Sequence, residues 1–354
     1  MKLLSICDPT RYSSPPLDVP TFYQHLARDS RVTFYHIPTP KVFTGQLPKV
    51  QAVLSAGELT YEEFLVLGAA AQDWISLADI DVIFCRTLKP FPPGYLDVLN
   101  TWEKFTRFVN RPASKKAQIK SDFLLKVAKD YIPAATVTSD WTQALTFFEQ
   151  FQIIVAKQAN SCGGRGVFKI WYQNGAFQVD NVLASTQTFP TFQAVMGYLQ
   201  VGQSEPIQFC RYLHRTHAGD KRVVVVDGEI YGSYLRRSQS GHWVNNVSSD
   251  GACTLADLTA DEVEAIQHTV GHYQALGLYT LGYDFLLDDD GTWRISEINA
   301  GNIGGFARLE LLTGQPMMDR LISWLIEYAQ RPPLDPIAQS PIAQTPDSAM
   351  MGVT

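Results

Sequence analysis

The sequence of 354 residues predicts a protein of the α/β (α+β) class with two or three packed units. Two patterns and the composition support this prediction. Strand-like and helix-like segments alternate over the first third of the chain, which is typical of an open α/β layer. Strand-like segments dominate from residue 153 onward, which favours a mixed, largely antiparallel body. Apolar residues make up 45% of the chain and charged residues 18%, as in an ordinary globular protein.

The first unit is expected over residues 1–111. Its apolar runs predict four strands and its periodic apolar positions predict two helices. The strands are Lys2–Cys7, Val32–Ile37, Asp81–Arg86 and Phe108–Asn110, and the helices are Val19–Ala27 and Tyr95–Phe105. The alternation of these elements predicts an open α/β domain that ends at Arg111.

Two further units and a tail are expected after Arg111. Residues 112–205 carry predicted helices at Lys115–Lys129 and Trp141–Phe151, the second with Asp140 as its N-cap. Residues 206–330 are mainly strands, interrupted by a predicted helix at Asp261–Leu276 that starts in a capping segment. Residues 331–354 are rich in Pro, Ala, Gln and Ser and repeat PIAQ, so a disordered tail is predicted.

The charge and cysteine content exclude several classes of function. A net charge of −6 without a basic block argues against binding to nucleic acid or to an anionic membrane surface. The five cysteines are odd in number, widely spaced and without a ligand pattern, which favours reduced thiols in the cytosol. No signal peptide and no membrane span are apparent. A soluble cytoplasmic protein that acts on small molecules is therefore expected.

The stretch GYDFLLDDDGTWRISEINAGNIGG places polar side chains in an apolar, strand-like run. Glu297 and Asn299 are two residues apart and share one face of a strand. If Asp288–Gly291 form the turn of a hairpin, Asp284 lies opposite Ile295 and roughly 7–8 Å from Glu297 on that face. Carboxylate and amide oxygens suit Mg²⁺, so a magnesium–nucleotide site is one interpretation. A solvated hairpin with polar residues at its end is the alternative.

The stretch VAKQANSCGGRGVFKI is a candidate phosphate-binding hairpin. Strand-like runs flank a loop that holds Gly163, Gly164 and Gly166, and Lys157 ends the first run. Glycines let several backbone N–H groups approach phosphate oxygens, and a lysine adds positive charge. The stretch matches neither the P-loop nor the dinucleotide fingerprint. A flexible surface turn is the alternative.

The stretch GDKRVVVVDGEIYGSYLRR predicts a hairpin with a buried strand at Val223–Val226 and a turn at Asp227 and Gly228. Arg222 and Arg237 then stand at strand ends, where arginines can stabilise charge on a transferring phosphoryl group. Two surface charges beside a hairpin are the alternative interpretation.

The order of these segments along the chain resembles the ATP-grasp superfamily, and specifically bacterial glutathione synthetases. The resemblance runs from the first strand to about Ala329 and includes LADIDVIFCR, VNRP and DKRVVVVDGE. It implies an ATP-grasp fold with three parts. These are an N-terminal Rossmann-like pre-ATP-grasp substrate domain (1–111), a lid subdomain with the glycine-rich loop (112–205), and a C-terminal mixed or antiparallel sheet that carries the catalytic and metal-binding groups (206–330).

The resemblance also implies roles for individual residues. It implies that Lys120 and Lys157 contact the phosphates of ATP, and that a mobile backbone lid at Ser161, Gly163, Gly164 and Gly166 covers these phosphates. Those implied for the adenine are Cys210, Arg211, Tyr212 and Leu213, and Asp220 falls at the ribose or nucleotide edge. For catalysis it implies that Arg222 and Arg237 bind the γ-phosphate and the acyl phosphate, and that Asn246 belongs to a loop that closes over the reaction. Those implied as Mg²⁺ ligands are Asp284, Glu297 and Asn299, with Mn²⁺ as an alternative metal.

The implied function is an ATP-dependent carboxylate–amine ligase that works through an acyl phosphate, with glutathione made from γ-glutamylcysteine and glycine. A homo-oligomer is also implied. Departures from the family pattern occur where Arg86 is followed by TLKPFPP, in VNNVSSDGA (Val244–Ala252), and in AGNIGG (Ala300–Gly305). Since these segments belong to the acceptor side, a ligase for another amino acid or for a peptide is one alternative. A regulatory protein that binds nucleotide without ligating is the other.

Overall fold

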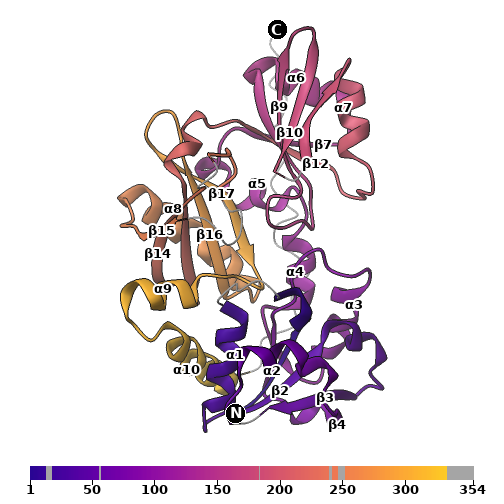
Figure 1. The fold of residues 1–354 in the computed structure, drawn as a ribbon, viewed down its shortest axis with the longest axis vertical. Coiled ribbons are helices and arrows are strands. Elements are labelled where there is room, and N and C mark those ends of the chain that lie inside the picture. Colours follow the sequence, from indigo (N-terminus) through magenta and orange to yellow (C-terminus); the bar gives the residue numbers. More distant parts are fainter. Residues whose placement is uncertain (13–17, 56, 183, 239–240, 246–251, 333–354) are drawn as a thin grey trace, which may run out of the picture.

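The structure is a computed structural model, and it describes residues 1–12, 18–55, 57–182, 184–238, 241–245 and 252–332. Three sheets lie one above another along the long axis of the molecule (Figure 1). The N-terminal sheet lies at one end, a six-stranded lid sheet at the other, and a five-stranded sheet between them. The α/β (α+β) class predicted from the sequence is confirmed. No helix in these ranges has the length and apolar character that crossing a membrane requires.

The N-terminal sheet has the strand order β4-β3-β2-β1-β5-β6. Its strands are β1 (Lys2–Cys7), β2 (Thr33–Pro38), β3 (Lys49–Ser55), β4 (Asp73–Ser76), β5 (Val82–Cys85) and β6 (Arg107–Val109). Strand β1 pairs in parallel with both β2 and β5, so the chain winds outward from β1 in two directions. In open α/β sheets, ligands bind outside the carboxyl ends of the strands at such a switch point.

Helices cover both faces of the N-terminal sheet. They are α1 (Asp18–Arg28) and α2 (Tyr61–Val66) on one face and α3 (Tyr95–Trp102) on the other. Helix α1 and its neighbours bury apolar side chains such as Phe22 and Phe34, whereas α3 packs Leu99 and Trp102 against the opposite face. The predicted α1, α3, β1, β2, β5 and β6 are confirmed within one to three residues at their ends, while α2, β3 and β4 were missed.

A single helix predicted at Lys115–Lys129 is wrong, because two short helices occupy this region. They are α4 (Pro112–Gln118) and α5 (Phe123–Ala128). The amide of Gln118 donates to the carbonyl of Ile298, and the hydroxyl of Ser121 donates to the carbonyl of Pro206. These bonds hold the turn between the helices, so α4 packs on α3 while α5 packs on the central sheet.

The lid sheet is antiparallel and has the order β11-β10-β9-β8-β12-β7. Its strands are β7 (Ala135–Thr138), β8 (Ile153–Lys157), β9 (Val167–Gln173), β10 (Ala176–Asn181), β11 (Ala184–Phe189) and β12 (Ile207–Arg211), and its helices are α6 (Trp141–Phe151) and α7 (Phe192–Leu199). The side chain of Asp140 accepts bonds from two backbone N–H groups of α6, which confirms it as the N-cap. Because β12 lies in this sheet, we propose that the lid unit ends after β12 instead of at residue 205.

The central sheet has the order β15-β14-β13-β16-β17. Its strands are β13 (Asp220–Val226), β14 (Glu229–Arg237), β15 (Ala252–Leu255), β16 (Thr280–Leu287) and β17 (Trp293–Ala300), and α8 (Ala260–Ala275) packs on one face together with α5. The predicted capping segment is confirmed, since Thr259 and Glu262 form a complete capping box at the start of α8. The opposite face turns its polar side chains toward the lid sheet.

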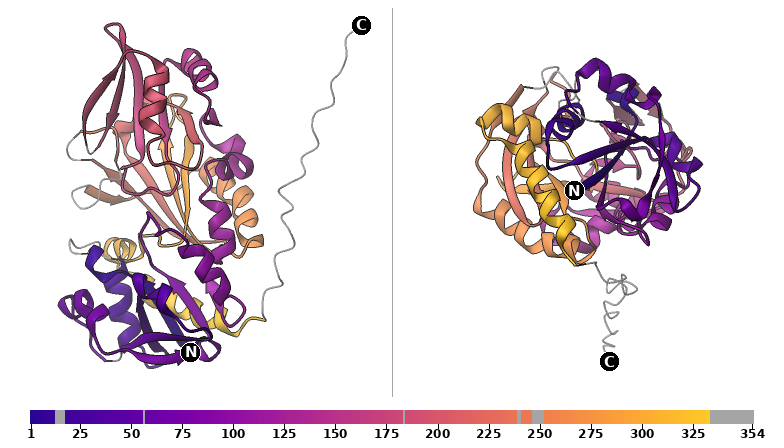
Figure 2. Two further views of the ribbon diagram at one scale, coloured as in Figure 1. Left: turned by 90° about the vertical axis from the view of Figure 1, so that its right-hand side faces the viewer. Right: turned by 90° about the horizontal axis from the view of Figure 1, so that it is seen from below.

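The last two helices join the central sheet to the N-terminal unit. They are α9 (Phe306–Thr313) and α10 (Met317–Gln330), and Figure 2 shows α10 lying along the N-terminal sheet. The carboxylate of Asp18 accepts bonds from the backbone N–H groups of Gly305 and Ala307 at the start of α9. The hydroxyl of Tyr328 donates to the carbonyl of Phe108 on β6. The loop between β17 and α9 is thereby held across the edge of the N-terminal sheet. The predicted tail lies, from residue 333 on, outside the described residues.

Candidate active site

A cavity of about 1110 Å³, counting its open mouth, lies between the lid sheet and the central sheet. It brings together twelve of the residues that the sequence predicted for nucleotide and metal. These are Lys157, Ser161, Gly163, Gly164, Gly166, Cys210, Arg211, Tyr212, Leu213, Asp220, Asp284 and Glu297. Lys120 is exposed and lines an adjoining pocket that shares Lys157 and Glu297 with the cavity. Segments far apart in the chain therefore converge on one space.

The glycine-rich loop connects β8 to β9, as predicted. Gly163 and Gly164 both have positive φ angles, of 64° and 75°, which favour glycine. A Cβ atom at Gly166 would lie 2.6 Å from the Ser161 hydroxyl, so a side chain there would displace the loop. The amide of Asn181 donates to three carbonyls of the loop and its end, at residues 164, 165 and 167. Asn181 was not anticipated from the sequence, because it lies on β10, outside the motif.

The same loop contacts the segment that follows β5 in the N-terminal unit. The backbone N–H of Phe91 donates to the side chain of Asn160 at 3.0 Å, and the Cys162 thiol donates to the carbonyl of Lys89 at 2.9 Å. The ammonium of Lys89 lies 3.8 Å from the carboxylate of Glu297. The segment TLKPFPP, in which this chain departs from the glutathione synthetase pattern, therefore contacts residues that line the cavity, and its Lys89 lines the adjoining pocket.

Lys157 ties the lid sheet to the central sheet. Its ammonium donates to the carbonyl of Ser296 at 2.8 Å and to the hydroxyl of the same residue at 3.1 Å. Ser296 is the bulged residue of β17, and its position one residue before Glu297 sets Lys157 beside the predicted metal ligands. A phosphate in the cavity would thus meet a lysine that the fold already holds in place.

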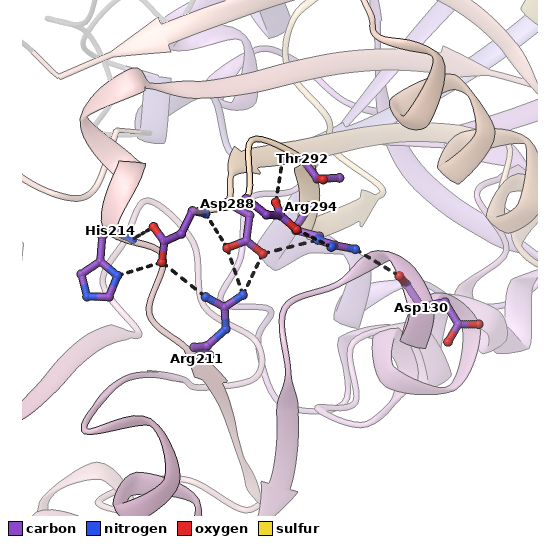
Figure 3. Close-up of polar contacts among 8 residues, drawn as sticks. Asp130, Arg211, His214, Asp288, Thr292 and Arg294 are labelled. Atoms are coloured by element: carbon purple, nitrogen blue, oxygen red, sulfur yellow. Dashed lines mark hydrogen bonds and ion pairs between the residues drawn. The ribbon is translucent and has the colours of Figure 1, made fainter.

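The predicted adenine segment, Cys210 to Leu213, forms the end of β12 and the start of the connection to the central sheet. The side chain of Arg211 makes two hydrogen bonds to Asp288, at 2.9 and 2.7 Å, and lies 3.6 Å from Asp289 (Figure 3). His214 also bonds Asp289, at 2.9 Å. Because the guanidinium of Arg211 is bonded to the turn between β16 and β17, we expect the main chain of this segment to make the hydrogen bonds to the adenine base.

Three buried charged side chains and the largely buried Arg236 form a network on the cavity face of the central sheet. Arg222 bonds both carboxylate oxygens of Asp284, at 2.7 and 2.9 Å. Arg236 bonds Asp220 at 2.5 and 2.9 Å and Asp284 at 2.7 Å. Burial alone would raise the pKa of Asp284, but the two guanidinium groups outweigh it and lower that pKa. Burial, with the repulsion from Asp284, instead raises the pKa of Asp220 despite its bonds to Arg236.

Arg237, which the resemblance implied for catalysis, lies on the opposite face of β14 from this network. It is exposed, and its Nε donates to the carbonyl of Ala218. In a regular hairpin with a two-residue turn at Asp227 and Gly228, Arg222 would face Ser233 and share a face with Arg237. A β-bulge at Tyr231 shifts the pairing by one residue, so Arg222 faces Tyr234. Arg236 therefore takes the place expected for Arg237.

A second bulge corrects the predicted metal hairpin. Asp284 lies directly opposite Glu297, and not opposite Ile295, because Ser296 is an extra residue in β17. The amide of Asn299 lies 3.3 Å from the carboxylate of Asp284 on the same face. Two carboxylates and an amide oxygen so placed are a donor set that suits Mg²⁺. The described residues hold no group of three His, Cys, Asp or Glu side chains that could bind a metal, and this set has only two such members.

The predicted closing loop is only partly described. Asn246 lies outside the described residues. Its neighbour Asn245 lines the cavity, and its amide donates to the carbonyl of Thr216 at 2.7 Å. The sequence did not predict a role for Arg236, Lys89, Ser296 or Asn245. Arg236 could have been identified only by counting strand positions around the bulge at Tyr231.

Comparison with protein families shows which known proteins the chain is similar to. Residues 123–314, more than half of the chain, match the family model described as prokaryotic glutathione synthetase, ATP-grasp domain. A glutathione synthetase of Prochlorococcus marinus subsp. pastoris is 24% identical over 336 residues, covering 92% of this chain and 99% of that protein. A glutathione synthetase of Gloeobacter violaceus is 24% identical over 263 residues, covering 72% of this chain and 75% of that protein.

Solved structures show the same fold. The ATP-grasp ligase PsnB, in complex with a variant of its minimal precursor, Mg and ADP, superposes with a TM-score of 0.57 at 16% identity, covering 93% of this chain and 98% of that one. D-cycloserine synthetase DcsG superposes with a TM-score of 0.57 at 14% identity, covering 92% and 100%. The predicted ATP-grasp fold is therefore confirmed.

Proposed function

Since the chain belongs to the prokaryotic glutathione synthetase family of ATP-grasp, ADP-forming carboxylate–amine ligases, we propose that it joins γ-glutamylcysteine to glycine through an acyl phosphate. The observation that carries this proposal is the convergence of Lys157, the glycine-rich loop, Asp284 and Glu297 on one cavity. A lysine and backbone N–H groups on one wall suit phosphates, and carboxylates on the other wall suit a divalent cation.

In the first step, a carboxylate oxygen of the substrate attacks the γ-phosphorus of ATP. The bond from that phosphorus to the bridging oxygen breaks, and ADP leaves. We assign Lys120 and Lys157 to the phosphates of ATP. Arg222 and Arg236 bond Asp284 on the opposite wall, and from there their positive charge would stabilise the transferring group. Because Arg236 is held by two carboxylates, its position is fixed before the substrate arrives.

Asp284, Glu297 and Asn299 would hold Mg²⁺ at this wall. Their oxygens come from two adjacent strands and one face, which fits a cation that takes one or two protein carboxylates and leaves other positions to phosphates and water. The bound cation would neutralise charge on the phosphate oxygens. Arg222 and Arg236 form ion pairs with Asp284 in the described structure. The charge of Asp284 would therefore be balanced both without and with the cation.

In the second step, the amine nitrogen attacks the acyl carbon, the carbon–oxygen bond to phosphate breaks, and the nitrogen loses a proton as the amide forms. Acyl phosphates react with water, so the cavity must be shielded during this step. The contacts of Asn160 with Phe91 and of Cys162 with Lys89 hold the glycine-rich loop against the N-terminal unit. We infer that this contact closes the cavity over the reacting groups.

A ligase for a different amino acid or a peptide is the second candidate. The segments after Arg86 and after Asn299, in which the sequence departs from the family pattern, face the acceptor side of the cavity. Complexes of PsnB and of the macrocyclase MdnC contain precursor peptides, so related folds accept peptides. The family model and the glutathione synthetase relatives favour an ADP-forming ligase over a regulatory protein without ligase activity.

The test is ADP release with Mg–ATP and γ-glutamylcysteine across a panel of the single amino acids, with mass spectrometry of the product. Glutathione formed with glycine would support the proposal in full. A different γ-glutamylcysteinyl product would replace glycine and keep the chemistry. Absence of ADP release with every amino acid would contradict γ-glutamylcysteine as the carboxylate substrate.

A further inference from the structure

A second, smaller pocket lies at the carboxyl edge of the N-terminal sheet. Its walls come from the end of β5, helix α3, helix α4 and the loop after β17. The lining residues that matter here are Phe91, Tyr95, Leu96, Lys115, Gly301 and Asn302. Phe91, Tyr95 and Leu96 lie on the α3 side, and Lys115 and Asn302 face them from α4 and the loop after β17; Thr87 and Asn110 add further polar groups to the lining.

Lys115 is a buried cation with little compensation. The residue is 5% exposed, and its ammonium donates to the side-chain oxygen of Gln118 at 2.6 Å. No carboxylate of the described residues forms an ion pair with it. Burial lowers its pKa well below the usual range, repulsion from Lys89 lowers it further, and attraction to Glu297 only partly offsets these effects. A buried charge whose only bonded partner is neutral is costly to the fold.

The position of Lys115 connects this pocket to the reacting centre. Gln118, which accepts from Lys115, donates in turn to the carbonyl of Ile298, the residue after Glu297. Gly301 passes so close that a Cβ atom there would lie 3.2 Å from the Lys115 side chain. Gly301 of AGNIGG thus makes room for the side chain of Lys115. The loop that departs from the family pattern is therefore in contact with this residue of α4.

The carboxylate of the described residues whose attraction raises the pKa of Lys115, Glu297, also interacts with other groups. Glu297 lies 3.8 Å from Lys89, and in the proposed function it is also a metal ligand. When Mg–ATP is bound, its charge is shared among the metal, Lys89 and Lys115. What the site then lacks is an anionic group that stays ionised throughout the reaction. The carboxylate that is phosphorylated does not meet this condition, because it becomes part of a mixed anhydride with phosphate. The glutamyl α-carboxylate of γ-glutamylcysteine stays ionised, and the titration below separates it from the amino acid, because γ-glutamylcysteine is already bound when the amino acid is added.

We propose, building on the proposed function, that Lys115 binds the free α-carboxylate of the amine substrate. The substrate is then a single small amino acid, whose side chain faces Phe91, Tyr95 and Leu96. Its amino group points toward Glu297 and the acyl phosphate. The amine of a peptide side chain and amines without a carboxylate are excluded as acceptors, because neither supplies the missing negative charge.

The experiment is calorimetric titration of the protein, loaded with Mg²⁺, a non-hydrolysable ATP analogue and γ-glutamylcysteine. The ligands are glycine, alanine and serine and the amide of each. The test variant is Lys115→Met, which keeps the length of the side chain and removes its charge. The matched control is Lys116→Met, since Lys116 is the next residue of α4 but is exposed and bound to Asp97.

We expect an amino acid that binds the wild type to bind Lys115→Met about 30-fold more weakly, the effect of one charged hydrogen bond. Its amide should bind the wild type about equally weakly, and the variant should not distinguish acid from amide. Lys116→Met should match the wild type, and all three proteins should bind the ATP analogue equally.

Equal binding of acid and amide by the wild type would overturn the proposal without any variant. So would unchanged amino acid affinity in Lys115→Met, or the absence of binding by every amino acid of the panel to the loaded wild type. Failure of the wild type to bind the ATP analogue would instead contradict the ligase function on which the proposal rests. A Lys115→Met protein that is at least as stable as the wild type is expected, because a buried cation is removed.

Discussion

The nucleotide side and the acceptor side of the molecule treat buried charge in opposite ways. On the nucleotide side, Arg222 and Arg236 are each bonded to carboxylates of Asp220 or Asp284, so every buried cation there has an ionic partner. On the acceptor side, Arg86 is 1% exposed and two of its nitrogens, Nε and Nη1, have no hydrogen-bond partner among the described residues. Lys115 has only a neutral one.

This difference separates what is common to the family from what is particular to this chain. The groups that would bind ATP and metal are held in place by one another before any ligand arrives. The acceptor side lies against TLKPFPP and AGNIGG, the segments that depart from the family pattern, and its two buried cations, Arg86 and Lys115, form no ion pair within the described ranges. Since an unpaired buried charge costs several kcal/mol, we infer that a substrate anion completes this side and that selectivity resides there.

The largest effect is expected at the metal wall. Glu297→Gln removes one charge from the proposed Mg²⁺ ligands without changing the volume of the side chain. We expect ADP release to fall by roughly a thousandfold or more, as for loss of a group that stabilises transition-state charge, with a normal circular dichroism spectrum. The measurement is steady-state ADP release under saturating Mg–ATP.

The control for this substitution is Glu229→Gln, on the same sheet but exposed and paired with Arg320. It should leave turnover within about twofold of the wild type, since surface ion pairs contribute little. If Glu297→Gln turns over at close to the wild-type rate, Glu297 is not a metal ligand, and the proposed difference between the nucleotide side and the acceptor side loses its basis.

The second prediction compares two adjacent arginines. Arg236→Met leaves Asp220 and Asp284 buried with one guanidinium fewer, so we expect a loss of about 3 kcal/mol in the free energy of unfolding and at least a hundredfold loss in kcat. Arg237→Met should change kcat by less than about twofold and the free energy of unfolding by less than about 0.5 kcal/mol, because Arg237 is exposed. Urea unfolding and ADP release on both variants measure this. The reverse order of effects would restore the assignment implied by the family resemblance.

Arginines 236 and 237 also show how far the sequence predicted this protein. Four strands of the N-terminal sheet, the helices α1, α3, α6 and α8, the glycine-rich hairpin and the motif order could be read from apolar periodicity and turn residues, because these signals are local. Which of two neighbouring side chains faces the cavity depends on strand register. A single bulge at Tyr231 reverses the faces of β14, and another at Ser296 moves Asp284 from Ile295 to Glu297.

Long-range contacts limited the prediction in a second way. Lys89 lies in a segment with no motif, and it reaches Glu297 only because the N-terminal unit packs against the β17 edge. Lys115 looked like an ordinary position in a helix, and its burial follows from the break between α4 and α5 and from the close approach of Gly301. No periodicity in the chain reports such contacts.

The third prediction concerns acid stability and the N-terminal unit. His36 on β2 is buried, with Nδ1 bonded to the Tyr23 hydroxyl, and burial lowers its pKa to about 3. In the unfolded chain a histidine titrates near about 6.5, so below that pH the unfolded state binds a proton that the folded state does not. Stability is therefore lost as the pH falls from about 6.5 toward 3, by up to about 1.4 kcal/mol per pH unit. His36→Gln should flatten this slope in urea unfolding at pH 6.5 and 5.0. An unchanged slope would mean that other groups control the acid stability.

The smallest effect is expected at Arg86, where the comparison between the two sides is most direct. Arg86→Met removes a buried guanidinium that donates one bond, to the carbonyl of Ile303, and lies over the rings of Phe84 and Phe22 at 5.0 and 5.7 Å. Because burial lowers the pKa of Arg86 and the attraction to Asp18 only partly offsets it, without a direct ion pair among the described residues, the free energy of unfolding should stay within about 1 kcal/mol of the wild type or rise. Arg236→Met, in contrast, should lower it by about 3 kcal/mol. Urea unfolding of the two variants under one buffer gives the comparison. If Arg86→Met is as destabilising as Arg236→Met, the ring contacts and the single carbonyl bond compensate the buried charge, and the acceptor side is as complete without substrate as the nucleotide side.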